Sequence, residues 1–214
     1  KEMIRKTFFS VSPDETRQAL NGLLLESEGD SVNLVGTDGH RLAMISRPVK
    51  SNAPKEEVLT FLLPKKALSE LLKLIEDEDA TLGFSSQDNH LAFICGKQVI
   101  VSRKIDGKFP NYRQVIPADN TLKAKANKGD LTHALKRVAL LADEKSKMVR
   151  FEIKKDSLTL VSDNTDLGAA NEEMSIEYDG EEVSIGLNAK YVLDILNAIE
   201  GDSVTLNLKD QNHS

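Results

Sequence analysis

Residues 63–84 read LPKKALSELLKLIEDEDATLGF and residues 187–208 read LNAKYVLDILNAIEGDSVTLNL, so one pattern occurs twice, 124 positions apart. In both copies apolar residues recur with spacings of 3, 1 and 3, which is typical of a helix with one buried face. An acidic turn follows the helix in each copy, and an alternating strand pattern follows the turn. A repeat of this length predicts two copies of one domain.

A second pair of segments supports the duplication. DSVNLV at residues 30–35 matches DSLTLV at residues 156–161. A helical pattern precedes each of them, at residues 3–9 and 131–141. Each copy is therefore expected to contain a helix, strands, a second helix and further strands.

Strand and hairpin signals fill the space between the predicted helices, beginning with a β-rich run at residues 58–63. Three hairpins are predicted, and their paired segments are residues 91–95 with 99–102, 148–153 with 157–161, and 174–178 with 183–187. The pattern indicates an α+β fold of two repeated domains, with helices on one face of antiparallel sheets. The aperiodic residues 116–120 separate the copies, which places the domains at 1–117 and 118–214.

Composition narrows the classes of protein that fit. The chain has 214 residues, of which 29% are charged and 40% hydrophobic, as in an ordinary soluble protein. No apolar run resembles a signal peptide or a membrane span, so no membrane partner is expected. The single cysteine, Cys95, cannot form an internal disulfide, which favours a reducing, cytoplasmic location.

The net charge of −6 argues against a simple basic nucleic-acid binder, but the charge is unevenly distributed. The predicted helical segments carry +2 (residues 1–9), +2 (64–75), +1 (130–141) and 0 (188–199), which leaves −11 for the remainder. If these helices share one face, that face is positive on a negative protein. The alternative is that their lysines and arginines only solvate helix surfaces.

The sequence carries no recognisable catalytic or metal-binding motif. It has no GxSxG, phosphate-binding loop, HExxH or paired-cysteine pattern, and its four histidines have no ligand-like spacing. Cys95 lies in an alternating run and is interpreted as a small strand residue. We therefore expect no enzyme activity, no cofactor and no metal.

Three motifs carry a resemblance to a known family. They are LNG at residues 20–22 followed by GTDGHRLA at 36–43, IDGKFPNYRQVIP at 105–117, and NAKYVLDILNAI at 188–199. Together they resemble the bacterial DNA polymerase III beta subunit family, the sliding clamps. The resemblance covers nearly the whole chain, as the middle and third of three DNA-clamp domains.

The resemblance implies a non-catalytic processivity factor, without exonuclease activity, that closes around duplex DNA. Family members form a head-to-tail homodimer ring of six domains, with helices on the inner face of the sheets lining the hole. Basic helix residues attract phosphates without reading bases, so the ring slides. The residues expected to face DNA are Arg5, Lys6, Lys65, Lys66, Lys73, Lys136 and Arg137.

The resemblance also implies a peptide-binding cleft between the middle and third domains. Its partners there would be the DNA polymerase III alpha subunit, the clamp loader delta subunit and other proteins that carry a clamp-binding motif. The matching positions are Leu20, Thr37, Gly39, His40, Arg41, Leu42, Pro110, Gln114 and Val115, with Asn188 and Tyr191 in a second lobe. Gln114 stands where many relatives have arginine, so a charge-assisted contact is expected to be absent. Asp38-Gly39 also fits a plain hairpin turn.

Compared with the family pattern, the first strand of the middle domain, the last strand of the third domain and the whole first domain are expected to be missing. Two other functions stay open. A protein-interaction module without DNA would explain the acidic net charge. A small hydrolase using Asp38 and His40 would need a nucleophile on a strained turn, and the sequence shows none.

Overall fold

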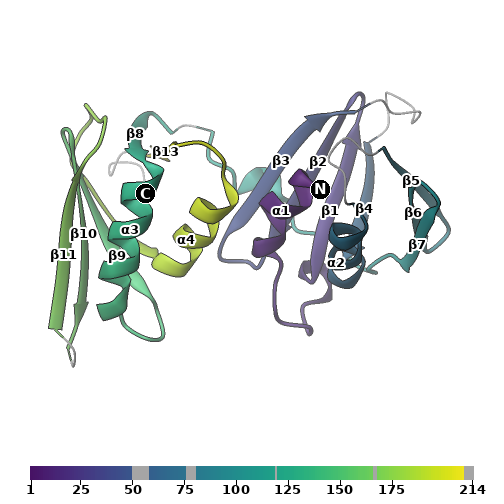
Figure 1. The fold of residues 1–214 in the computed structure, drawn as a ribbon, viewed down its shortest axis with the longest axis horizontal. Helices are drawn as coiled ribbons and strands as arrows, with labels where there is room; N and C mark the ends of the chain where they lie inside the picture. The colour runs from purple at the N-terminus through teal and green to yellow at the C-terminus, as the bar shows by residue number, and fades with distance from the viewer. Residues whose placement is uncertain (50–57, 76–80, 119, 166–167, 210–214) are drawn as a thin grey trace. The chain divides into compact units, whose positions relative to one another are not determined.

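The computed structural model describes residues 1–49, 58–75, 81–118, 120–165 and 168–209 (Figure 1). The chain divides into two compact units, residues 1–115 (unit 1) and residues 116–214 (unit 2). No helix in the described ranges is both long and apolar enough to cross a lipid bilayer.

Unit 1 combines helices with two antiparallel sheets. Its helices and strands are α1 (Glu2–Thr7), β1 (Gly22–Glu28), β2 (Ser31–Thr37), β3 (Leu42–Pro48), β4 (Val58–Pro64), α2 (Lys65–Leu74), β5 (Leu82–Gln87), β6 (His90–Cys95) and β7 (Gln98–Arg103). Short 3-10 turns lie at Phe8–Ser10, Gln18–Leu20 and Tyr112–Gln114. The strand orders are β3-β2-β1-β4 and β5-β6-β7.

Unit 2 repeats the four-stranded sheet of unit 1 and the helices before and after it. Its elements are β8 (Leu122–Asn127), α3 (Lys128–Val138), a 3-10 turn (Ala139–Leu141), β9 (Met148–Lys154), β10 (Ser157–Asn164), β11 (Gly168–Ser175), β12 (Val183–Asn188), α4 (Ala189–Ala198) and β13 (Ser203–Leu208). The order β11-β10-β9-β12 reproduces β3-β2-β1-β4 in strand order, and β13 pairs with β8. The predicted α+β fold with two copies of one domain is confirmed.

The helices form where the sequence pattern predicts them. α2 buries Ala67, Leu68 and Leu71 along one side, as the 3, 1, 3 spacing requires. α4 begins at Asn188, whose side chain accepts a hydrogen bond from the Tyr191 N–H at 3.2 Å and so caps the helix. In unit 1, α1 and α2 contact each other and the same sheet. The helices therefore cover one face of that sheet.

The sheet of unit 1 buries both of its faces, because successive residues of a strand point to opposite sides. On the helix side, Leu23 and Leu63 pack with Leu68 and Leu71. The opposite face carries a second set, here called the loop-side cluster. The buried members of the loop-side cluster are Leu20, Leu24, Val35, Leu62, Phe109 and Tyr112. This cluster positions the candidate site.

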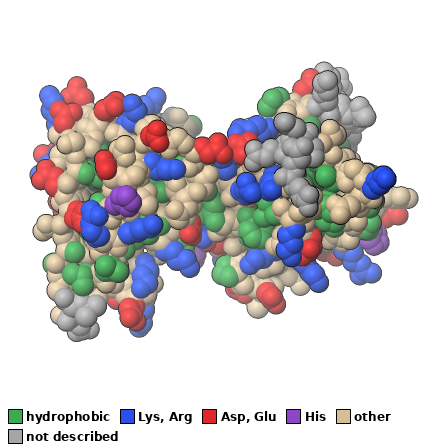
Figure 2. Space-filling model, in the orientation of Figure 1, with side chains coloured by type: hydrophobic (Ala, Val, Ile, Leu, Met, Phe, Trp, Pro, Cys, Tyr) green, Lys and Arg blue, Asp and Glu red, His purple; other side chains and the backbone are tan. Residues whose placement is uncertain are grey.

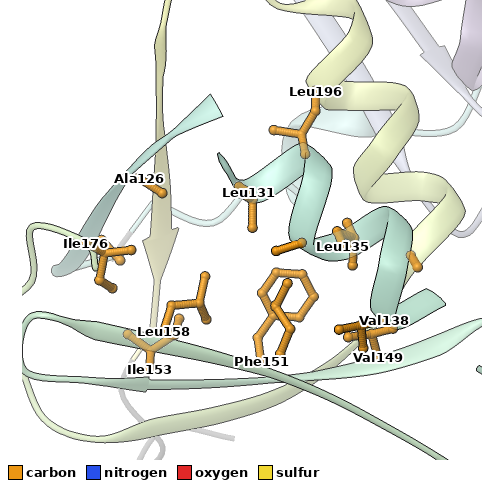
Figure 3. Packing of buried hydrophobic residues seen from close by; sticks show 14 of the residues in the cluster. Ala126, Leu131, Leu135, Val138, Val149, Phe151, Ile153, Leu158, Ile176 and Leu196 are labelled. Carbon is orange, nitrogen blue, oxygen red and sulfur yellow. The ribbon is translucent and has the colours of Figure 1, made fainter. Parts of the chain in front are cut away.

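The core of unit 2 lies between its four-stranded sheet and helix α3 (Figure 3). Val149, Phe151 and Ile153 alternate along β9 and are at most 1% exposed. Leu131 and Leu135 of α3 are fully buried against them. Phe151 is the largest of these side chains, so it contributes the most apolar area to the unit.

The hairpin predicted between residues 174–178 and 183–187 is wrong. β11 pairs with β10, whereas β12 pairs with β9 at the opposite edge of the sheet. The chain leaves the sheet after Ser175, and Glu177 exchanges two backbone hydrogen bonds with Lys125 of β8, at 2.8 and 3.0 Å. Because Ile176 and Tyr178 are buried, this connection is a packed crossover rather than a surface turn. The other two predicted hairpins are present, as β6-β7 and β9-β10.

Candidate functional site

Two of the predicted cleft residues of unit 1 lie on the sheet face that the helices leave uncovered. Leu20 belongs to the loop-side cluster, and Leu42 packs against it half-buried. Thr37 pairs with Leu42 at the end of the β2-β3 ladder. Two segments far apart in the sequence, the β2-β3 turn and the 3-10 turn ending at Leu20, thus meet at one site.

The turn between β2 and β3 is built by side-chain hydrogen bonds to its own backbone. The Thr37 hydroxyl donates to the Arg41 carbonyl at 2.7 Å and accepts from the Gly39 N–H at 3.0 Å. Gly39 has φ of +91°, a conformation that favours glycine, and an added Cβ would lie 2.8 Å from the Arg17 guanidinium. The predicted turn is therefore present, and it holds His40 exposed at its tip.

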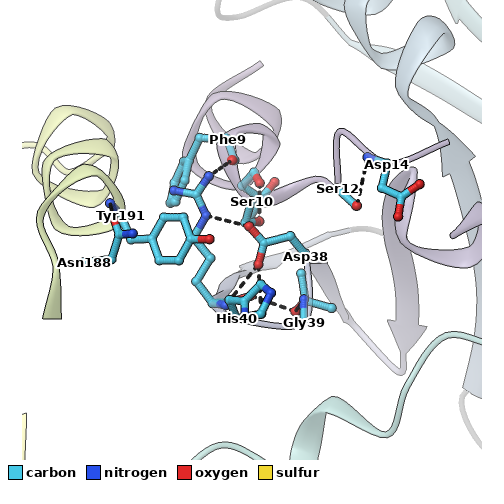
Figure 4. Close-up of polar contacts among 12 residues, drawn as sticks. Phe9, Ser10, Ser12, Asp14, Asp38, Gly39, His40, Asn188 and Tyr191 are labelled. Atoms are coloured by element: carbon cyan, nitrogen blue, oxygen red, sulfur yellow. Dashed lines mark hydrogen bonds and ion pairs between the residues drawn. The ribbon is translucent and has the colours of Figure 1, made fainter. Parts of the chain in front are cut away.

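Asp38 is the buried anchor of this turn (Figure 4). Its carboxylate accepts from the backbone N–H groups of His40 and Arg41, at 2.9 and 3.1 Å, and from the Arg41 side chain at 3.1 Å. Burial on its own would raise the pKa of Asp38, but these hydrogen bonds outweigh burial and hold the pKa below its usual value. The carboxylate is consequently ionised and committed to shaping the turn.

Arg41 points into unit 1, where it connects the turn to the end of α1. Its guanidinium donates to the Phe9 carbonyl at 2.7 Å and lies 5.3 Å from the centre of the Phe9 ring. The side chain is only 13% exposed. Its part in the site is therefore to fix the turn against the residues that follow α1.

The irregular segment 105–115 carries the other residues of unit 1 that are predicted to form a wall of the site. The Ile105 N–H donates to the Leu62 carbonyl at 3.1 Å, and Phe109 and Tyr112 are buried in the loop-side cluster. Between and after these anchors, the predicted residues Pro110, Gln114 and Val115 are exposed, Val115 by 67%. Pro110 and Val115 therefore present apolar side chains to solvent on a segment that is anchored at Phe109 and Tyr112.

A polar group that the sequence analysis missed holds this wall. Glu26 is 7% exposed in the centre of β1 and accepts hydrogen bonds from Tyr112 and Arg113. The signal available in the sequence was a glutamate directly after the apolar run GLLL in the strand GLLLESE. A buried carboxylate needs donors, so the position alone could have predicted a partner but not which one.

Unit 2 holds the two remaining predicted peptide-binding residues at the start of α4. The Asn188 side chain caps this helix and also donates to the Ser146 carbonyl at 2.8 Å. Tyr191 lies in the first turn and is half-buried. Asn188 is therefore fixed by two contacts within its own unit.

The predicted DNA-facing residues all lie on helices α1, α2 and α3. Arg5, Lys66, Lys73, Lys136 and Arg137 are exposed, and Lys6 and Lys65 are partly so. Lys6, Lys73 and Arg137 pair with Glu2, Glu70 and Glu172, at 2.5, 2.9 and 2.5 Å. In each unit taken by itself, Figure 2 shows lysine and arginine side chains on the surface turned to the viewer, with acidic side chains among them.

The geometry disfavours the hydrolase interpretation. Asp38 bonds the backbone of His40, which leaves the imidazole without the carboxylate orientation that a catalytic histidine needs. No group of three or more His, Cys, Asp or Glu side chains in the described ranges could hold a metal ion. Asp38 and Arg41 are instead held by hydrogen bonds within unit 1.

Comparisons with known proteins agree with this geometry. Residues 1–111 match the family described as the DNA polymerase III beta subunit, central domain, and residues 113–214 match the C-terminal domain of the same subunit. The beta sliding clamp of Escherichia coli K12 is 34% identical over 210 residues, which cover 98% of this chain and 57% of that protein. That of Pseudomonas aeruginosa is 32% identical over 214 residues, which cover 100% of this chain and 58% of that protein.

Solved structures show the same likeness. A crystal structure of the DNA polymerase sliding clamp from Pseudomonas aeruginosa superposes with a TM-score of 0.93 at 32% identity, covering 99% of this chain and 58% of that one. A clamp from the same organism, solved bound to griselimycin, also gives a TM-score of 0.93 at 32% identity, covering 99% and 57%.

Two repeated α+β domains with paired helices, carrying these turns, define a protein built from DNA-clamp domains. The chain belongs to the DNA polymerase III beta subunit family. It spans 57–58% of the length of the relatives named above.

Proposed function

We propose that the protein is a sliding clamp: a non-catalytic processivity factor that encircles duplex DNA and tethers a polymerase to it. Residues 1–117 would act as the middle clamp domain and residues 118–214 as the third. The observation that carries the proposal is the match of both units to clamp domains, together with an excess of positive charge on their helices. In this proposal the intact protein closes a ring as a head-to-tail homodimer in the cytoplasm.

The charge on the observed helices supports non-specific DNA binding. α1 carries +1, α2 and α3 each carry +2, and α4 is neutral, on a chain whose net charge is −6. Cations on helix surfaces attract phosphates of any sequence, while an acidic remainder disfavours DNA elsewhere. Lys66 and Lys136 are exposed and fit this role better than Lys73 and Arg137, which have acidic partners.

Replacing Lys66 by alanine tests the DNA-facing surface. Removing one phosphate contact should weaken binding equally for all sequences and lower the slope of log affinity against log salt by about 1. The measurement is a titration of fluorescent duplex DNA with the intact protein at several salt concentrations. Lys97→Ala, at the exposed turn between β6 and β7, is the matched control and should leave the slope unchanged.

Equal slopes for wild type and Lys66→Ala would remove this residue from the DNA surface. Tight binding to one sequence at physiological salt would contradict sliding altogether. The absence of any DNA binding would favour the second candidate, a protein-interaction module, which the acidic net charge independently favours.

The site on unit 1 is proposed to bind short apolar peptides of the DNA polymerase III alpha subunit, the clamp loader delta subunit and other proteins with clamp-binding motifs. Leu20 and Leu42 supply an apolar wall, and Pro110 and Val115 supply a second one on the segment 105–115. We propose Asn188 and Tyr191 as the other lobe of the same cleft, on the strength of the sequence resemblance.

Self-association has its own support within unit 2. Leu140 follows α3 and is 77% exposed, more than any other large hydrophobic side chain of the described residues. The turn that holds it contacts β11, an edge strand of the four-stranded sheet. We propose this edge as part of the subunit contact, because an edge strand can pair with a strand of another chain.

A further inference from the structure

The wall of the proposed peptide site depends on a segment with little regular structure. This segment runs from Arg103, where β7 ends, to Val115. The only helical element within it is the 3-10 turn Tyr112–Gln114. The backbone hydrogen bonds that close this turn are long, from Gln114 to Asn111 at 3.3 Å and from Val115 to Tyr112 at 3.2 Å. Side-chain contacts must therefore fix where Pro110 and Val115 lie.

One carboxylate supplies the central polar contact. Oε1 of Glu26 accepts hydrogen bonds from the Tyr112 hydroxyl at 2.6 Å, from Arg113 Nη2 at 2.5 Å and from Asn33 Nδ2 at 3.1 Å. The Asn33 side-chain oxygen accepts in turn from the Ser46 hydroxyl at 2.5 Å. This chain of hydrogen bonds runs from β3 through β2 and β1 to the segment that forms the wall.

The carboxylate is held in its charged form. Burial would raise the pKa of Glu26, but the hydrogen bonds from Tyr112, Asn33 and Arg113 outweigh burial and keep the pKa below its usual value. For Tyr112, burial and the neighbouring Glu26 raise the pKa to about 12, so its hydroxyl stays a donor. Hydrogen bonds to an ionised, buried acceptor are stronger than those between neutral groups.

We propose that Glu26 is a positioning residue for the peptide-binding site, fixing the segment from Pro110 to Val115 through Tyr112 and Arg113. The inference rests on the proposed peptide-binding function. Glu26 is 7% exposed and need not touch the peptide. If the segment is ordered only part of the time, only that fraction of the protein can bind the peptide. The apparent affinity for the peptide then falls in proportion to that fraction.

The test is a titration of a labelled apolar peptide that ends in leucine and phenylalanine, followed by fluorescence polarisation on the intact protein. Glu26→Gln keeps the size of the side chain but removes the charge that binds Arg113, and we expect binding about tenfold weaker. Tyr112→Phe removes only the hydroxyl and should weaken binding about threefold. It also keeps the proposal testable if Glu26→Gln does not fold.

Glu28→Gln is the matched control. Glu28 lies two residues along the same strand and accepts from the same Arg113 at 3.0 Å, but it is 53% exposed. Exposed ion pairs contribute little, so its peptide affinity should stay within about twofold of wild type. The double variant Glu26→Gln with Tyr112→Phe should lose less than the two single variants together, because both break one network.

A positioning role also predicts a local change in the free protein. Amide hydrogen exchange at residues 111–115 should accelerate in Glu26→Gln, while exchange in strands β1 and β2 stays as in wild type. Three outcomes would overturn this inference while leaving the proposed peptide-binding function intact. They are a normal peptide affinity of Glu26→Gln, an equal loss of affinity in Glu28→Gln, and additive losses in the double variant. A wild-type protein that binds no peptide would overturn the proposed function and this role together.

Discussion

Leu42→Ala is expected to weaken binding of the apolar peptide by about 2–3 kcal/mol, which is roughly 30–150-fold. Leu42 is half-buried beside Leu20 against the loop-side cluster, where a peptide leucine or phenylalanine would cover its remaining surface. Alanine removes that apolar area and leaves a void against the peptide. The measurement is fluorescence polarisation on the intact protein and on the variant.

Gln114→Ala is the control for this experiment. Gln114 is exposed on the same wall but carries no charge, so its loss should change the affinity little. A thermal melt of each variant shows whether the fold is retained. If wild type and Leu42→Ala bind with equal affinity, the cleft has been assigned to the wrong residues.

Phe151→Ala should lower the free energy of unfolding of unit 2 by about 3–5 kcal/mol, the largest stability effect expected here. Phe151 lies on β9, is 0% exposed and belongs to the same core cluster as the buried residues of α3. Its replacement by alanine loses a large apolar area and leaves a cavity. Such a loss is a large part of the roughly 5–15 kcal/mol that stabilises a typical domain. Urea denaturation followed by circular dichroism measures it.

Met148→Ala provides the comparison within the same strand. Met148 begins β9 but is 57% exposed, so its replacement should alter the free energy of unfolding by no more than about 0.5 kcal/mol. Equal destabilisation by the two substitutions would show that the alternation along β9 does not separate core from surface as described.

The parts of the fold that follow from local patterns were predictable. The spacing of Leu68, Leu71 and Leu72 predicts a helix with one buried side, and the same spacing recurs in α4. In α4 Leu196 is buried as predicted, but Ile195 is 37% exposed. In both copies of the repeated pattern a strand follows the helix. The duplication of the domain could therefore be predicted from the positions of the apolar residues alone. The site residues came from motif resemblance. The structure places Leu20 and Leu42 at the loop-side cluster, whereas Arg41 contacts the residues that follow α1.

The rest depended on contacts between residues distant in sequence. The hairpin predicted around Asp179-Gly180 failed because β12 joins β9, and no local signal distinguishes a tight turn from a crossover that packs Tyr178 into the core. The partner of Arg137 is Glu172, 35 residues later on β11. Such pairs are set by the tertiary fold, so charge counted along a helix overstates what the helix offers to DNA.

The most direct test of the clamp proposal is retention on DNA of different topology. The intact protein is loaded by its clamp loader onto a nicked circular duplex, the loader is removed, and the bound protein is followed before and after a single cut linearises the DNA. Because retention by a ring depends on closure and not on tight contacts, we predict a long lifetime on the circle and rapid loss from the free ends once it is cut. The same lifetime on circular and linear DNA would contradict encirclement.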